Sequence, residues 1–348
     1  MIRHNVDVAL GLQYGDEGKG KVVKSLSKNY DYVLRFNGGG NAGHTTYDNE
    51  KKFITHLVSC GIFHGVPAII GPGCVFNVKK LIEEVNYLES NGVSVYRKLF
   101  IAENAHIITD EHLQEETSES KIGTTRQGIG PAYRDKYNRT GLLAKDCKEL
   151  SSFNLIDMYE FLYKTKKIYN ILCEGAQAFH LDIDWGEYPY VTSSHCGLCS
   201  VLLNGISKDW IENVYGVAKV YETYVGSKQF ENKNNPLFEK IRQLGEEFGA
   251  TTGRPRQVNW LNLDRLVKSI QMNSVTHLYI NKLDILMELR EYQYYWNGTH
   301  RSCPDVNYFV HDITDIITLH TGCESIYFSK SKYDIEEVVA IETVYEAI

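Results

Sequence analysis

The chain has 348 residues, enough for one large domain or two smaller ones, and its 43% hydrophobic and 23% charged content is typical of a globular protein. The net charge of -7 argues against a nucleic-acid-binding scaffold, so positive charge for an anionic ligand must be local. The N-terminal segment lacks a signal-peptide pattern, and no apolar stretch approaches the roughly 18–20 residues that cross a bilayer, so we expect a cytoplasmic protein without a membrane partner.

Short β-rich segments alternate with helical patterns along the chain. A strand is predicted at Asn5–Leu12 and a second at Tyr32–Phe36, and each runs into a glycine-rich segment. Asn77 is predicted to cap a helix that ends before Gly92. Further strands are predicted at Lys98–Ala102, Lys167–Leu172, Val214–Val220 and Leu278–Asn281, a helix at Trp260–Asn273, and a surface loop at Ser227–Asn235.

This alternation predicts an α/β fold with a large, mostly parallel central sheet flanked by helices. A P-loop-like phosphate loop follows the first strand. No linker or repeat is evident, so residues 1–348 are predicted to form a single domain. Ligands of such sheets bind beyond the carboxyl ends of the strands, where the glycine-rich segments are found here.

The first of these segments is Gly15-Asp-Glu-Gly-Lys-Gly-Lys21. Glycines let backbone N–H groups turn toward an anion, and the start of a helix adds a favourable dipole. The spacing is that of a P-loop, but Val22 stands where a P-loop NTPase or kinase needs Ser or Thr. Asp16 is repulsive to an anion unless a metal or a proton transfer uses it. The alternative is a tight strand–helix turn with solvated charges.

The second segment is Arg35-Phe-Asn-Gly-Gly-Gly-Asn-Ala-Gly-His-Thr45. Its His44 can donate a proton to a phosphoryl oxygen, although a single histidine is more often structural. Farther along, His195 precedes Cys196-Gly-Leu-Cys199, which is half of a metal-binding pattern. The second CxxC pair is absent, so free cysteines are the preferred interpretation there.

Six ordered blocks of the sequence resemble the adenylosuccinate synthetase family. After GDEGKGK and NAGHT, the matching blocks are residues 122–133 (IGTTRQGIGPAY), 174–177 (EGAQ) with 181–194 (LDIDWGEYPYVTSS), 248–256 (FGATTGRPR) and 282–284 (KLD). The family is a purine-nucleotide ligase that joins L-aspartate to C6 of a nucleoside monophosphate through a 6-phosphoryl intermediate.

The resemblance implies a role for each matching residue. Asp16 is expected to take the N1 proton of the purine, His44 to act as the acid, and Lys19 to face the phosphates. The expected contacts of the substrate nucleotide are Asn41, Thr125, Arg139, Gln177, Thr192 and Val225. The expected L-aspartate contacts are Thr251, Thr252, Arg254 and Arg256, and those of the nucleoside triphosphate are Gly15, Gly18, Gly20, Lys282 and Asp284.

The resemblance also implies a cofactor and an assembly. Mg²⁺ is expected on Asp16 and the carbonyl of Gly43. Arg139 is expected to reach the 5′-phosphate bound by a partner subunit, which implies a homodimer.

Two substrate choices stay open because the chain departs from the family in four places. The spacing between Arg139 and Gln177 is short, and the late STGP loop is replaced at residues 328–333 (FSKSKY). RVGAGPFPTE becomes residues 224–230 (YVGSKQF), and SSNTTAGG becomes residues 193–199 (SSHCGLC). IMP is the preferred substrate, and the phosphate donor is left open between GTP and ATP or dATP. The alternative is the compact phage branch, in a host cytoplasm, which converts (d)GMP with ATP or dATP. An inactive nucleotide-binding paralogue is the third possibility.

Overall fold

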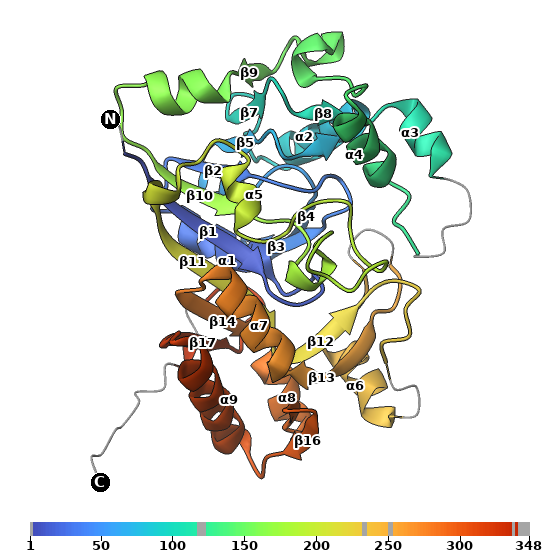
Figure 1. The fold of residues 1–348 in the computed structure, drawn as a ribbon, viewed down its shortest axis with the longest axis vertical. Coiled ribbons are helices and arrows are strands. Elements are labelled where there is room, and N and C mark those ends of the chain that lie inside the picture. The colour runs from blue at the N-terminus through green and yellow to red at the C-terminus, as the bar shows by residue number, and fades with distance from the viewer. Residues whose placement is uncertain (1–2, 117–122, 232–234, 250–252, 336–337, 340–348) are drawn as a thin grey trace.

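A ten-stranded sheet forms the centre of the computed structural model, which describes residues 3–116, 123–231, 235–249, 253–335 and 338–339 (Figure 1). Its strands, in spatial order, are β18 (Val338–Val339), β17 (Ser325–Ser329), β14 (His277–Asn281), β11 (Ile211–Lys219), β1 (Asn5–Gly11), β10 (Asn170–Glu174), β2 (Tyr32–Arg35), β5 (Ala68–Ile70), β7 (Leu99–Ala102) and β9 (Asn154–Ile156). All neighbouring pairs are parallel except β17 with β18. The predicted α/β fold with a large, mostly parallel sheet is confirmed.

Helices cover the two faces of this sheet. Val6, Val8 and Leu10 of β1 belong to the large core, whereas Ala9 packs on the opposite face with Val23 of the first helix. The helices are α1 (Lys19–Ser27), α2 (Val78–Ser90), α3 (Asp110–Glu115), α4 (Ile129–Asn138), α5 (Cys199–Leu202), α6 (Pro236–Leu244), α7 (Leu263–Asn273), α8 (Leu283–Leu289) and α9 (Val306–Thr321). Both faces of the central strands are therefore buried, as a parallel sheet requires.

Smaller sheets and turns complete the described fold. A four-stranded sheet contains β12 (Tyr221–Tyr224), β13 (Gln257–Asn262), β15 (Gln293–Trp296) and β16 (Thr299–Ser302). Two further pairs are β3 (His44–Asp48) with β4 (Lys51–Thr55), and β6 (Val75–Phe76) with β8 (His106–Ile107). Short helical turns are η1 (Cys60–His64), η2 (Ala144–Asp146), η3 (Lys148–Leu150), η4 (Glu160–Lys164), η5 (Phe179–Leu181) and η6 (Lys208–Trp210). Among the described residues, no helix is both long and apolar enough to cross a membrane.

The predicted helix at Trp260–Asn273 is wrong at its start. Residues 257–262 form β13, in which Trp260 pairs with Tyr221 and Leu261 with Tyr294. The helix begins only at Leu263. Asn262 caps it, because its side-chain oxygen accepts the backbone N–H of Arg265 at 3.0 Å. A strand and a helix joined without a loop share one apolar run, so the local spacing alone could not divide them.

Two other predictions need correction. The strand predicted at Lys167–Leu172 begins at Asn170 and continues to Glu174, whose register partner is Arg35. The predicted surface loop at Ser227–Asn235 is described only in part, since residues 232–234 lie outside the described residues. Its Phe230 is buried against Tyr14 and Tyr224 and is not a surface residue.

Candidate active site

A cavity of about 1180 Å³ lies beyond the carboxyl ends of the central strands. It is larger than the roughly 300–1,000 Å³ of an ordinary ligand pocket, so it has room for more than one substrate. The segments that follow β1, β2, β10, β14 and β17 all contribute to its lining. Parallel strands bring these segments to one edge of the sheet although they are far apart in sequence.

The loop between β1 and α1 forms the floor of the cavity. Gly15 and Gly18 have φ values of 89° and 92°, and Asp16 between them has a φ of 61°, in the left-handed region that few side chains adopt. The Glu17 carboxylate accepts the backbone N–H groups of Gln13 and Gly15 and lies 2.7 Å from Lys19 Nζ. Sequence analysis did not single out Glu17, yet it holds both the loop and its lysine in place.

His44 begins β3 and is buried at the side of the cavity. Its Nδ1 contacts Glu174, whose carboxylate also lies 3.2 Å from Arg35 Nη1 and accepts the backbone N–H of Cys60. Burial lowers the pKa of His44 to about 4, and the Arg35 charge acts in the same direction. The ring is therefore neutral at pH 7, and Nε2 is the nitrogen left for a ligand.

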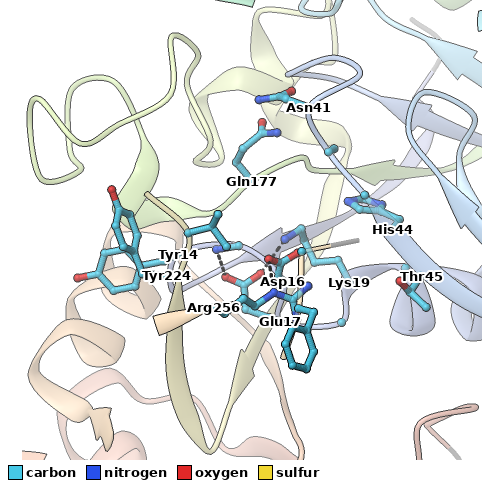
Figure 2. Close-up of a pocket in the computed structure, with 18 of the residues that line it drawn as sticks. Tyr14, Asp16, Glu17, Lys19, Asn41, His44, Thr45, Gln177, Tyr224 and Arg256 are labelled. Carbon is cyan, nitrogen blue, oxygen red and sulfur yellow. Dashed lines mark hydrogen bonds and ion pairs between the residues drawn. The ribbon is translucent and has the colours of Figure 1, made fainter. Parts of the chain in front are cut away.

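Asp16 is paired with Arg256, which directly precedes β13. Arg256 Nε lies 2.8 Å from Asp16 Oδ2, while Arg256 Nη1 lies 2.5 Å from Glu247 Oε2. Figure 2 shows Arg256 beside the loop residues Asp16, Glu17 and Lys19, below Gln177.

Glu247 holds this arginine from behind. It is fully buried, and its second oxygen lies 3.0 Å from Lys219 Nζ and accepts the Tyr221 hydroxyl at 2.7 Å. Burial raises the pKa of Glu247, but Lys219 and Arg256 outweigh this effect and lower the pKa to about 2. Glu247 therefore remains charged at pH 7.

Two amide side chains face the cavity on the side of β2 and β10. The oxygens Asn41 Oδ1 and Gln177 Oε1 are buried and have no hydrogen-bond partner among the described residues. The two side chains lie close together above the phosphate loop (Figure 2). Unpaired buried oxygens are costly unless a ligand satisfies them, so both suit a polar ligand group.

The expected residues separate into three groups. Those that line the cavity are Gly15, Asp16, Gly18, Lys19, Gly20, Asn41, Gly43, His44, Thr125, Gln177, Thr192, Val225, Arg256, Lys282 and Asp284. Arg139 is exposed at the end of α4, and Arg254 is exposed with its Nη1 3.4 Å from Gly123 O, so neither lines the cavity. Thr251 and Thr252 lie outside the described residues.

The segment in which the sequence departs from RVGAGPFPTE forms part of an aromatic cluster. The rings of Tyr14 and Tyr224 lie 5.9 Å apart, and Phe230 lies 5.0 Å from Tyr14. Tyr14 and Tyr224 both line the cavity next to Val225. The wall on this side of the cavity is therefore aromatic and tightly packed.

Comparison with known proteins shows which sequences this chain is similar to. The family model of adenylosuccinate synthetase matches residues 8–160 and 149–325. The adenylosuccinate synthetase of Borrelia turicatae is 38% identical over 337 residues, covering 82% of this chain and 78% of the relative. The adenylosuccinate synthetase of Salinibacter ruber is 39% identical over 364 residues, covering 85% of this chain and 82% of the relative.

Two solved structures have the same fold. The fully ligated adenylosuccinate synthetase from Plasmodium falciparum has a TM-score of 0.83 and 28% identity, covering 94% of this chain and 98% of that one. The succinoaminodeoxyadenylate synthetase of cyanophage S-2L, bound to dGMP and dATP, has a TM-score of 0.77 and covers 97% and 95%. The second is 21% identical, so its likeness concerns the fold alone.

Proposed function

The chain belongs to the adenylosuccinate synthetase family, and from this membership we propose how its site works. The family reaction is a C–N ligation of purine nucleotide biosynthesis that joins L-aspartate to IMP. The observation that carries the proposal is the meeting of Asp16, Lys19, His44 and Arg256 in one cavity. It also argues against an inactive paralogue, because no expected charged residue of this group is missing.

Asp16 serves as the base in this proposal. The 6-oxygen of a 6-oxopurine is a poor nucleophile until N1 loses its proton, and a carboxylate held in the cavity can accept that proton. The backbone of Asp16 is left-handed, and its carboxylate lies beside Arg256. The deprotonated oxygen then attacks the γ-phosphorus of the triphosphate, and the nucleoside diphosphate leaves.

His44 and Lys19 act on the transferred phosphoryl group. The negative charge of this group raises the pKa of a nearby histidine. Binding of the triphosphate would therefore favour protonation of His44, which can then act as the acid. The Lys19 ammonium has three N–H donors, so it can keep its contact with Glu17 and also donate to the phosphate oxygens, which neutralises charge in the transition state.

Arg256 binds L-aspartate while it remains held by Glu247. A guanidinium has five N–H donors, so Arg256 can keep its contact with Glu247 and still bind a carboxylate. This position brings the amine of L-aspartate toward the purine that Asp16 deprotonates. The amine displaces the 6-phosphate, which leaves as inorganic phosphate. Arg254, Thr251 and Thr252 complete the aspartate site in this proposal.

Mg²⁺ is the proposed cofactor, held by the Asp16 carboxylate and the Gly43 carbonyl. Both residues line the cavity, and hard oxygen donors of this kind suit Mg²⁺, which takes its remaining ligands from phosphates and water. When bound, Mg²⁺ would spread the negative charge of the phosphates.

A homodimer is proposed because Arg139 lies on the surface, away from the cavity of its own chain. Its expected 5′-phosphate contact requires the cavity of a second copy. The solution mass should therefore be that of two chains.

We also assign the enzyme to the cytoplasm, or to the cytoplasm of a host if the source is viral, because the reaction uses free nucleotides.

The test is a matrix of IMP, GMP and dGMP against GTP, ATP and dATP, with the consumption of L-aspartate as the measurement. We expect triphosphate turnover only when a 6-oxopurine monophosphate and L-aspartate are both present, with IMP and GTP the preferred pair. Turnover that is indifferent to L-aspartate would contradict the proposal. Preference for dGMP with dATP or ATP would instead assign the phage-type reaction.

A further inference from the structure

The cavity continues past the phosphate loop toward β14 and β17. Asn281, the last residue of β14, donates its side-chain N–H to Glu17 O at 2.7 Å. Lys21 Nζ donates to Ser329 Oγ and Ser331 O, both at 2.7 Å. These bonds hold the ends of both strands against the loop that faces the phosphates.

The order of the strands assigns this side of the cavity to the phosphate donor. β1 lies in the middle of the sheet, with β10 and β2 on one side and β11, β14 and β17 on the other. Gln177 and Asn41 follow β10 and β2, on the side proposed for the substrate nucleotide. A triphosphate that places its γ-phosphate over the loop must therefore direct its base toward Lys282, Asp284 and residues 330–333.

Two tyrosines from distant segments meet at this end. Tyr47 lies in β3 and Tyr333 follows β17, and their ring centroids are 5.0 Å apart at an interplanar angle of 71°. Lys332 Nζ lies 5.5 Å from the centroid of Tyr47 and 5.6 Å from that of Tyr333. All three residues line the cavity, and Tyr333 is 48% exposed. Aromatic rings stack on planar ligand groups, and the exposed side chain of Lys332, whose ammonium lies over both rings, can shift to admit one.

The surrounding contacts hold the backbone that carries each of these rings. Ser331 Oγ accepts the backbone N–H of Tyr333 at 3.0 Å, and Lys24 donates to the carbonyl of Tyr47. Lys52 and Lys332 each lie 3.8 Å from one oxygen of Glu246. These exposed ion pairs are weak, so the side chains can adjust when a ligand enters.

We infer that Tyr47, Tyr333 and Lys332 hold the base of the phosphate donor by its face. This inference rests on the proposed function, because it assumes that a nucleoside triphosphate is the donor. Every purine has a similar π-face, so stacking supplies affinity without choosing between adenine and guanine. The choice between adenine and guanine is then made by groups that contact the edge of the base. Asp284 lines the same part of the cavity and is one such group.

Steady-state kinetics of Tyr333→Ala provide the first test. We expect the KM for both GTP and ATP to rise about tenfold, as for the loss of one base–aromatic stack, with kcat nearly unchanged. The ratio of the two KM values should stay within about twofold, because the lost contact does not distinguish the bases. Tyr333→Phe should restore wild-type KM values. Tyr308→Ala, which removes an exposed tyrosine of α9 outside the cavity, is the matched control.

A binding measurement separates this inference from the proposed function. Tyr333→Trp should lose tryptophan fluorescence when ADP or GDP is added without other substrates, and Tyr308→Trp should not. If Tyr333→Trp is quenched while the wild-type enzyme performs no ligation, the base site stands and the proposed reaction fails. If ligation occurs but Tyr333→Trp is not quenched and Tyr333→Ala leaves both KM values unchanged, the inference is overturned. A change in only one of the two KM values overturns it as well.

Discussion

At the scale of single residues, three buried carboxylates hold the groups that we assign to the chemistry. Glu17 contacts Lys19, Glu174 contacts His44, and Glu247 contacts Arg256. A buried carboxylate is costly unless it is paired, so each pairing fixes both partners in one geometry. The consequence for catalysis is that the reactive side chains are oriented before substrates bind.

The Asp16 carboxylate carries the first prediction. Asp16→Ala removes the proposed base, and we expect kcat to fall by about 10²–10⁴-fold, the usual contribution of a general base. Binding of IMP should survive, because Asn41 and Gln177 lie on another part of the wall. Rapid-quench kinetics and calorimetric titration measure the two effects separately. A rate near that of the wild type would contradict the assignment of Asp16 as the base.

Glu222 supports a prediction about pH and stability. It is 1% exposed, its Oε1 has no hydrogen-bond partner among the described residues, and its Oε2 lies 3.0 Å from Arg265. Burial raises its pKa to about 7, which the Arg265 charge only partly opposes. The folded state therefore keeps a proton on Glu222 that the unfolded chain has lost, so stability falls as the pH rises from about 4.5 through 7.

The test compares the wild type with Glu222→Gln, which cannot ionise. The free energy of unfolding of the wild type, relative to the variant, should decrease by up to about 3 kcal/mol between pH 5 and pH 8. Urea denaturation at several pH values measures this difference. Glu212→Gln, a change at an exposed carboxylate, is the control. A difference between wild type and Glu222→Gln that does not vary with pH would contradict the prediction.

At the scale of elements, the sequence predicted the strands that begin with apolar runs and end at glycines. Asn77 does cap α2, with its side chain accepting the N–H of Lys80 at 3.2 Å. The predicted element boundaries were wrong where pairing with a distant strand determines the structure. Trp260 is in a strand because Tyr221 pairs with it, and β10 extends to Glu174 because Arg35 lies opposite. Neither partner is near in sequence, so no local pattern could reveal the pairing.

The candidate site was predictable to the extent that its residues follow strand ends. Three of these residues follow the end of a strand of the central sheet, namely Asp16, Gln177 and Lys282. His44 follows β2 by a longer loop and begins β3. All four line the cavity. Glu17, Glu174 and Glu247 were not predicted as site residues, because the sequence around a glutamate in a loop or strand does not indicate whether its side chain is buried. Only the fold shows that Glu247 lies behind Arg256.

At the scale of the whole molecule, one large hydrophobic core joins elements from the first and the last parts of the described chain. The core cluster runs from Val6 of β1 to Phe309 of α9 and Phe328 of β17. The cavity likewise draws on segments from Tyr14 to Tyr333. An element that shares its core with distant segments cannot unfold without exposing their apolar surface, which favours cooperative behaviour.

The prediction that residues 1–348 form a single domain follows from this shared core. Differential scanning calorimetry should show one unfolding transition, with the calorimetric and van't Hoff enthalpies in agreement for the unfolding unit. IMP together with a non-hydrolysable GTP analogue should move the whole transition to higher temperature, since both ligands bind only the folded cavity. Two resolved transitions, of which ligands shift only one, would show instead that the chain is divided and that the cavity belongs to one part.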